Sequence, residues 1–160
     1  MADILTPEKR SAHMRRIRGV DTTPELVVRR LLHSMSYRFR KHVRGLPGRP
    51  DIVFQRRKMV VYVNGCFWHF HEGCQSAHIP NTRSEFWKAK FEGNRARDKR
   101  NIAEMTNRGW KTLTLWECEI ADGEQLANRL AAFLGPSRWR PIGQALAASH
   151  RGPLHSQASG

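Results

Sequence analysis

Residues 59–74 constrain the possible folds of this chain more than any other stretch. They open with Met59–Val63, an apolar run rich in β-branched residues that is typical of a buried strand. Asn64 and Gly65 break that strand, and the next nine residues include two cysteines, two histidines and three large aromatic residues. A hydrophobic core rarely holds such a mixture, because a buried imidazole needs hydrogen-bond partners. The segment therefore predicts a strand followed by a loop that combines a metal site, a catalytic edge and an aromatic wedge.

The charge of the chain indicates a polyanionic partner. Its 160 residues include 28 Lys and Arg against 14 Asp and Glu, which gives a formal net charge of +14 at pH 7. A surface this basic attracts polyanions, and nucleic acid is the leading candidate because clusters of aromatic residues accompany the charge. A ribosome-like or merely solubilising basic surface is the alternative.

Cysteine usage and hydropathy predict an intracellular protein. The sequence shows no signal peptide, and no apolar run approaches the length of a membrane span. Three cysteines, an odd number, argue against a disulfide framework. We therefore expect no membrane association and a reducing compartment.

The order of the predicted elements indicates an α/β fold, with a mixed sheet flanked by helices. The elements are a helix after the capping box Thr22–Glu25, strands at 37–43, 51–54 and 59–63, a helix from Ser84 with a kink at Gly93, a strand at 111–116, and a helix capped by Asp122. The strands at 51–54 and 59–63 are expected to form a hairpin. We divide the chain into a basic N-terminal arm (residues 1–20), a central domain (21–135) and a flexible tail (136–160).

Three cysteines and one histidine form a candidate structural zinc site. The candidates are Cys66, His71, Cys74 and Cys118. Three thiolates and one imidazole supply the closed tetrahedral set that Zn²⁺ prefers, so this metal is not expected to perform hydrolysis. His69 and His78 compete with His71 as the nitrogen ligand. Three unrelated buried cysteines are the alternative interpretation.

Two carboxylates and a histidine are candidates for hydrolytic chemistry. Asp51 begins one strand of the expected hairpin, where a carboxylate beside backbone carbonyls suits Mg²⁺. His69 can accept a proton from water, and Asp98 can fix the tautomer of such an imidazole. A turn-capping role for Asp51 and a helix-surface ion pair for Asp98 are the alternatives.

Aromatic residues near the metal ligands are candidates for contact with DNA bases. These residues are Phe67, Trp68 and Trp87. On a basic protein, exposed rings can stack on bases or insert between base pairs, at less cost where pairing is already weak. Phe86 and Phe91 are expected to pack in the core instead. Met14 and Ile17, on the basic arm, could insert likewise.

Taken together, these residues resemble the very-short-patch-repair (Vsr) family of DNA mismatch endonucleases. The matching motifs, within about residues 8–134, are Gly48-Arg-Pro-Asp51, Gly65-Cys-Phe-Trp-His69, Thr82-Arg-Ser-Glu-Phe-Trp87, Asn94-x-x-x-Asp98 and Gly109-Trp-x-x-Leu…Trp116-Glu-Cys118. The resemblance implies a restriction-endonuclease-like α/β core in the central domain. It also implies a magnesium-dependent nick in duplex DNA, 5′ to the T of a T:G mismatch that arises when 5-methylcytosine deaminates.

The same resemblance implies roles for individual residues. Asp51 and the main-chain carbonyl of Val63 would bind magnesium, and His69 would be the general base, assisted by Asp98. Glu25 matches a family acid near the site and would assist there. Zinc would be held by Cys66, His71, Cys74 and Cys118. DNA would be contacted from the major groove by Phe67, Trp68 and Trp87, and in the minor groove by Met14. The expected protein is a cytoplasmic, nucleoid-associated bacterial monomer that acts on duplex DNA with a T:G mismatch, with a mismatch-repair scaffold protein as a further partner.

Three features depart from the family pattern. Val63-Asn64 stands where relatives carry Thr-His, and Asn64 cannot serve as a protonatable group. The gap between His71 and Cys74 is one residue longer, and the strand at 61–63 lacks the lysine of related restriction nucleases, which favours His69 as the base. Two other functions fit the composition: a restriction-type endonuclease that acts on fully paired DNA, and a non-catalytic zinc-stabilised DNA-binding module.

Overall fold

A computed structural model describes residues 19–137 of the chain. Met14, Ile17 and most of the predicted basic arm lie outside these residues, as does most of the predicted tail. No helix in the described part is both long and apolar enough to cross a membrane.

The first described helix, α2, spans Thr23–Ser34 and begins at the predicted capping box. Thr22 is its N-cap residue, but its hydroxyl does not bond the helix backbone. The carboxylate of Glu25 instead accepts hydrogen bonds from the Asp21 amide (3.0 Å) and from the Thr22 hydroxyl (2.9 Å). The buried carboxylate thus satisfies an amide just outside the helix and fixes the start of α2.

Three strands form one mixed sheet in the order β1-β2-β3: β1 (Ile52–Phe54), β2 (Met59–Asn64) and β3 (Lys111–Trp116). β1 runs antiparallel to β2, which confirms the predicted hairpin, and β3 runs parallel to β2. A short 3-10 turn, η1 (Gln55–Arg57), joins β1 to β2.

The prediction of a strand at residues 37–43 is wrong. In that segment only Arg40 pairs with the sheet, through a single antiparallel bridge to Val53. The backbone at His42 adopts φ +55°, which turns the chain out of the extended conformation directly after the bridge. The alternation of apolar and basic residues therefore reflects one buried side of an irregular segment.

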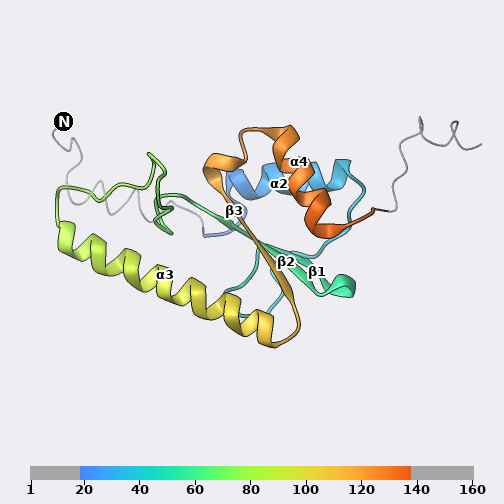
Figure 1. The fold of residues 1–160 in the computed structure, drawn as a ribbon, viewed down its shortest axis with the longest axis horizontal. Coiled ribbons are helices and arrows are strands. Elements are labelled where there is room, and N and C mark those ends of the chain that lie inside the picture. Colours follow the sequence, from blue (N-terminus) through green and yellow to red (C-terminus); the bar gives the residue numbers. More distant parts are fainter. Residues whose placement is uncertain (1–18, 138–160) are drawn as a thin grey trace, which may run out of the picture.

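Helices cover both faces of the sheet (Figure 1). α2 and α4 (Gly123–Leu134) pack on one face, and α3 (Ser84–Asn107) packs on the other. The core between the sheet and α2 and α4 includes Val28, Leu32, Ile52, Phe54, Val61, Leu115, Leu126, Leu130 and Leu134. The core on the α3 side is smaller and comprises Val53, Val60, Tyr62 and Met105. The predicted α/β class with a mixed sheet flanked by helices is confirmed.

Helix α3 runs unbroken through Gly93, so the predicted kink is wrong. A glycine in a helix lowers stability by about 1 kcal/mol relative to alanine but leaves the backbone hydrogen bonds in place. Phe91 and Met105, both buried, attach the helix on either side of Gly93. The predicted cap of α4 is confirmed, because the Asp122 carboxylate accepts from the amides of Glu124 (3.1 Å) and Gln125 (3.0 Å).

Candidate active site and metal centre

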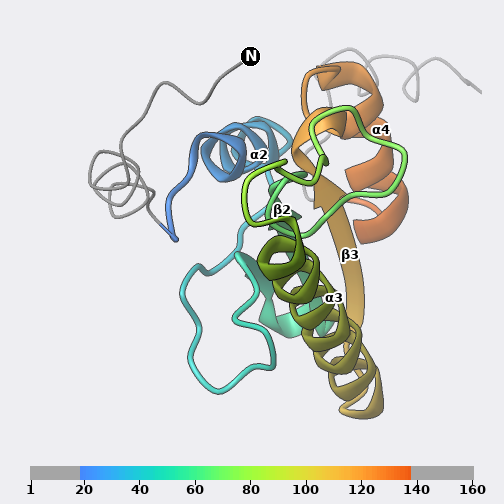
Figure 2. The ribbon, with the colours of Figure 1, turned by 90° about the vertical axis from the view of Figure 1, so that its left-hand side faces the viewer.

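The loop at residues 65–83 connects β2 to α3 and carries most of the predicted site residues. In Figure 2 this loop lies above the start of α3 and beside the end of β3. Its first turns are closed by backbone hydrogen bonds, from the His69 amide to Gly65 (3.2 Å) and from the His71 amide to Cys66 (3.0 Å). These turns direct His69 and His71 toward different neighbours.

Four side chains form a candidate metal centre: Cys66, His71, Cys74 and Cys118. Their potential ligand atoms all lie within 4.8 Å of one another. The Nδ1 atom of His71 lies 3.7 Å from the Sγ of Cys66 and 3.4 Å from the Sγ of Cys118. A tetrahedral zinc ion with ordinary bond lengths separates its sulfur and nitrogen ligands by about 3.6 Å. The distances from His71 to Cys66 and Cys118 are therefore close to those of a tetrahedral S₃N site, and Cys74 lies near enough to complete the set.

The surrounding residues hold His71 in this cluster. The Trp116 ring stacks on the His71 imidazole, with centroids 4.1 Å apart and planes 3° apart. Cys118 lies in the 3-10 turn η2 (Glu117–Glu119), directly after β3. The end of β3 thus supplies the stacking ring, and the turn that follows it supplies a thiol. Of the three histidines that compete in the sequence, His71 is the one in the cluster.

The thiols differ in their affinity for protons. Burial raises the pKa of Cys66, and desolvation of the Cys118 thiol raises the pKa of that group to about 12. A backbone hydrogen bond from Ser76 lowers the pKa of Cys74. Without a cation, two of the three thiols therefore retain their protons at neutral pH. A metal ion that binds the cluster has to displace those protons.

His69 turns away from the cluster and pairs with a residue of α3. Its Nδ1 atom lies 2.5 Å from the Oδ2 atom of Asp98, and both side chains are about one-quarter exposed. Asn94, one helical turn earlier, donates a hydrogen bond to the Trp68 carbonyl at 2.9 Å. Helix α3 thus fixes both the imidazole and the loop backbone beside it. Nδ1 is engaged by a carboxylate, which leaves Nε2 to exchange a proton with a substrate.

Asp51 lies in the same pocket as His69 and Asp98. The pocket holds about 120 Å³ and is also lined by Val63 and Asn64, at the end of β2. The Val63 amide donates a hydrogen bond to Oδ2 of Asp51 at 2.7 Å. Burial raises the pKa of Asp51 to about 6, despite that hydrogen bond. A cation would stabilise a carboxylate whose negative charge is disfavoured in this way, so the pocket suits a divalent metal ion.

The structure adds residues that the sequence analysis did not identify. Arg49, Tyr62 and Asn101 line the same pocket. Gly48 lies so close to Asn101 that a Cβ atom at Gly48 would approach its Nδ2 atom to 2.9 Å. Asn101 lies one helical turn beyond Asp98, and this spacing is the only sequence signal that could have pointed to it.

Glu25 does not line this pocket and belongs to a buried ionic cluster at the start of α2. Its Oε2 atom accepts a hydrogen bond from Arg29 at 2.8 Å, and Arg29 also pairs with Asp21. Burial and the Val63 hydrogen bond have the largest effects on the pKa of Asp51. The charge of Glu25 comes next and raises that pKa, and the charge of Arg29 lowers it. Glu25 thus acts on the pocket through space. The helical spacing of Glu25 and Arg29 could have indicated the pair.

The predicted wedge residues form an aromatic patch with a cationic rim. Its members are Phe67, Trp68, Phe86, Trp87 and Phe91, and neighbouring centroids lie 5.2–5.6 Å apart. Phe67, Trp68 and Trp87 are half-buried, whereas Phe91 is buried as expected. The prediction that Phe86 packs in the core is wrong, because its side chain is 46% exposed.

The position of Phe86 on α3 explains its exposure. Successive residues of a helix point about 100° apart, so Trp87 faces the loop while Phe86 faces outward. The Arg83 guanidinium lies 4.6 Å from the Phe86 centroid, and the Lys90 ammonium lies 5.6–5.8 Å from the rings of Trp68, Phe86 and Trp87. The patch therefore presents aromatic faces and positive charge together.

Comparison with known proteins places these residues in one family. A family model described as DNA mismatch endonuclease Vsr matches residues 2–76. The chain is 47% identical over 137 residues to the type II nicking enzyme V.XorIIP of Xanthomonas oryzae pv. oryzae, covering 86% of this chain and 100% of that protein. It is 39% identical over 128 residues to the DNA mismatch endonuclease Vsr of Escherichia coli K12, covering 80% and 81% respectively. A third relative, the type II nicking enzyme V.NmeAIP of Neisseria meningitidis, is 39% identical over 130 residues.

Proposed function

The chain belongs to the Vsr family of DNA mismatch endonucleases, and we propose that it nicks one strand of duplex DNA 5′ to the T of a T:G mismatch. Such mismatches arise when 5-methylcytosine deaminates. The observation that carries the proposal is the pocket that Asp51, His69 and Asp98 share, beside the aromatic patch. The mixed sheet and its flanking helices are consistent with a restriction-endonuclease-like core in residues 21–135.

Asp51 and the main-chain carbonyl of Val63 are the residues that would hold a magnesium ion. Magnesium bound there would stabilise negative charge on the phosphate and on the leaving 3′-oxygen. The carboxylate is already oriented by the Val63 amide, 2.7 Å from Oδ2, so little rearrangement is needed to bind a cation. The carboxyl has to be ionised for this role, and its pKa of about 6 allows that at neutral pH.

His69 is proposed as the general base. Water attacks the phosphorus atom, its proton passes to Nε2 of His69, and the bond from phosphorus to the 3′-oxygen breaks. Asp98, 2.5 Å from Nδ1, holds the imidazole in the tautomer that can accept this proton and stabilises the imidazolium that forms. Glu25 is proposed to assist indirectly: its ion pair holds Arg29, and the charge of Arg29 lowers the pKa of Asp51.

A zinc ion is proposed for the separate cluster of Cys66, His71, Cys74 and Cys118. Its four donor groups complete a tetrahedral shell, so a zinc ion there has no open position for water or phosphate. The role of the cluster would be to attach the end of β3 to the loop at 65–83. Two neighbouring metal sites thus have separate tasks.

The aromatic patch is proposed to contact the mismatch. Phe67, Trp68 and Trp87 would enter from the major groove, and Met14 would press on the minor groove. Insertion between base pairs costs a few kcal/mol, and less where pairing is already weak, which favours a mismatch over a paired site. The exposed ring of Phe86, with Arg83 beside it, extends the same surface toward a flanking phosphate. We further propose that the protein acts as a monomer on nucleoid DNA and meets a mismatch-repair scaffold protein there.

One experiment tests the assignment. The protein and Mg²⁺ are incubated with duplexes that are end-labelled on each strand in turn and carry either T:G or C:G at one position. The expected result is a nick in the T-bearing strand only, on the 5′ side of the T, and none in the C:G duplex. Cleavage of both duplexes would identify a restriction-type nuclease, and binding without cleavage would identify a non-catalytic DNA-binding module.

A further inference from the structure

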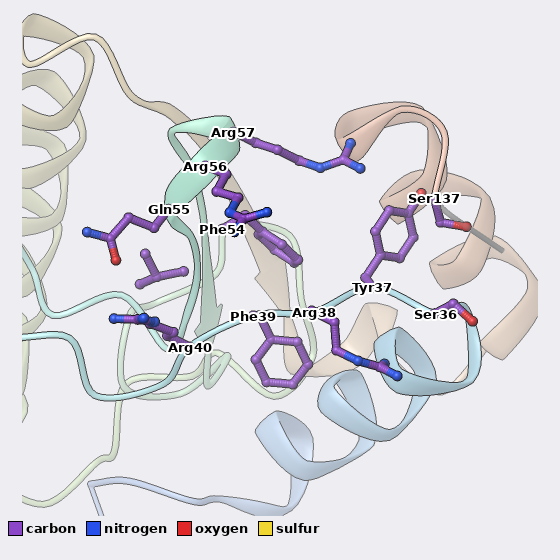
Figure 3. Close-up of a pocket in the computed structure, with 11 residues that line it drawn as sticks. Ser36, Tyr37, Arg38, Phe39, Arg40, Phe54, Gln55, Arg56, Arg57 and Ser137 are labelled. Carbon is purple, nitrogen blue, oxygen red and sulfur yellow. The ribbon is translucent and has the colours of Figure 1, made fainter.

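We refer to the pocket that Asp51, His69 and Asp98 line as the catalytic pocket. A second hollow lies at the opposite end of the sheet. It holds about 540 Å³ and is lined mainly by residues 36–40 and 53–57 (Figure 3). Asp51 precedes β1, whereas this hollow surrounds the turn η1 that follows β1. None of its lining residues lines the catalytic pocket. We refer to this hollow as the arginine groove, because four arginines line it: Arg38, Arg40, Arg56 and Arg57.

Aromatic rings form the base of the arginine groove. The Phe54 ring lies 6.3 Å from that of Tyr37 and 6.2 Å from that of Phe39, in edge-to-face contacts. Tyr37 and Phe54 are buried, but Phe39 remains half-exposed. The groove can therefore accept an apolar side chain without rearrangement of the core.

One wall of the groove is held rigidly. The Arg57 guanidinium lies 5.6 Å from the centre of the Tyr37 ring. It also donates hydrogen bonds to the carbonyls of Leu134 and Pro136, at the end of α4. The Tyr37 hydroxyl donates to the Gly135 carbonyl. These contacts fix the depth of the groove before any ligand binds, and such preorganisation reduces the entropy lost on binding.

The other three arginines give the groove an uncompensated positive charge. Arg38, Arg40 and Arg56 are exposed, and within residues 19–137 their side chains form no ion pair and no hydrogen bond with another residue. No Asp or Glu is among the described residues that line the groove. A ligand for this surface has to supply negative charge at the rim and an apolar group at the base.

We propose that the arginine groove binds an acidic segment of another protein, with an apolar side chain of that segment inserted against Phe39 and Phe54. The carboxylates of the segment pair with Arg38, Arg40 and Arg56. Guanidinium groups bind carboxylates through paired hydrogen bonds, which adds geometric selectivity to the attraction of charge.

Two other occupants fit less well. Duplex DNA presents a convex row of phosphates, which gives an apolar, ring-lined hollow nothing to bury. The chain's own residues 138–160 include Arg138, Arg140 and Arg151 but no Asp or Glu, so the positive rim repels them. An acidic and apolar protein segment satisfies both the charge and the shape.

Fluorescence anisotropy of labelled peptides tests the proposal with the full-length protein at physiological ionic strength. The probe peptide is Glu-Asp-Phe-Asp-Glu-Leu-Asp-Glu, and its matched control replaces Phe and Leu with Ser. We expect the probe to bind at least about tenfold more tightly than the control peptide, because only the probe can fill the base of the groove. The double variant Arg38→Ser/Arg56→Ser should weaken probe binding by about tenfold or more, while Arg44→Ser, an exposed arginine outside the groove, should not.

Three results would overturn the proposal. Equal affinity for the two peptides would mean that only net charge attracts them. An equal loss of affinity for paired duplex DNA in the double variant would assign the arginine groove to the DNA interface. Self-association of the parent protein in sedimentation that disappears in the double variant would make a second copy the occupant. Phe39→Ser should remove the preference for the probe peptide, and a thermal melt shows whether that variant is folded.

Discussion

At the scale of single residues, the burial of Asp51 makes the stability of the fold depend on pH. The carboxylate is mostly buried, and its pKa rises from 3.8 to about 6. The folded protein therefore binds a proton at this carboxyl more tightly than the unfolded chain does. The associated stability is fully present below pH 3.8 and is lost as the pH rises to about 6. Above that pH the ionised, metal-free site destabilises the fold by about 3 kcal/mol.

Replacement of Asp51 by Asn should separate stability from activity. The side-chain amide introduced by Asp51→Asn carries no charge and retains an oxygen that can accept the hydrogen bond of the Val63 amide. Without added magnesium, we expect the variant to melt a few degrees above the parent at pH 8, with a smaller difference at pH 5. Nicking should disappear while binding to T:G duplex remains. A lower melting temperature at pH 8, measured by circular dichroism, would contradict the assignment of a destabilising charge.

The pair of His69 and Asp98 predicts a graded loss of nicking. His69→Ala should reduce the single-turnover nicking rate by roughly 10²–10⁴-fold, because it removes the proposed general base. Asp98→Asn should cause a smaller loss, since the imidazole remains present but is less well oriented. Both variants should bind the T:G duplex as the parent does.

Glu104→Gln serves as the matched control for this pair, because Glu104 is an exposed carboxylate on the same helix α3 and lies outside the pocket. Its nicking rate should equal that of the parent. If His69→Ala retained the parent rate, His69 could not be the general base.

At the scale of elements, the continuity of α3 determines which residues meet. The helix spans 24 residues without a break and carries Asn94, Asp98 and Asn101 at successive turns along one face. Asn94 holds the Trp68 carbonyl, Asp98 holds His69, and Asn101 lies against Gly48. A kink at Gly93 would have changed the direction of this face relative to the sheet. One straight helix thus positions the loop, the proposed base and the turn before Asp51.

The turn before Asp51 provides a prediction with an internal control. Gly45 and Gly48 both adopt positive φ angles, +82° and +68°, so alanine at either position is strained. Only at Gly48 does a Cβ atom meet a neighbour, the side chain of Asn101. Gly45→Ala should lower stability by about 1 kcal/mol and leave nicking intact. Gly48→Ala should lower stability further and slow nicking, because the turn has to shift away from the catalytic pocket. Equal effects of the two substitutions on melting and on nicking rate would argue against a tight contact there.

At the scale of the whole molecule, the cysteine cluster connects segments that are distant in the sequence. Cys66, His71 and Cys74 lie in the loop after β2, whereas Cys118 follows β3. The two strands already pair in parallel through the register Val63↔Leu115. A metal ion in the cluster would join the loop to the end of β3 and so hold His69 at a fixed place above the sheet.

Removal of one ligand should therefore affect folding as well as activity. Cys118→Ser should lose bound zinc, which is expected at one ion per chain in the parent, and should melt at a clearly lower temperature. Gln75→Ala, an exposed change in the same loop, is the control. Because the pKa values of Cys66 and Cys118 are raised, zinc affinity should fall as the pH is lowered. Metal analysis by mass spectrometry, together with thermal melts, measures both effects. A zinc-free protein with the melting temperature of the parent would refute a structural zinc.

Local interactions explain which features the sequence could predict. The hairpin of β1 and β2, the cap at Asp122 and the proximity of Cys66, His71 and Cys74 all depend on residues close together in the chain. The sequence alone therefore determined the α/β class, the position of the functional loop and its candidate metal ligands. The sequence motifs also resemble one family, and that resemblance predicted a DNA mismatch endonuclease.

Tertiary packing decided the remainder. Only the family resemblance, and no pattern in the residues themselves, linked His69 to Asp98. The sequence could not show that Phe86 faces outward or that α3 continues through Gly93. Nor could it show that residues 36–40 and 53–57 enclose an arginine groove. Each of these features depends on which faces of separate elements meet, and sequence spacing specifies a residue's own face but not the neighbour that covers it.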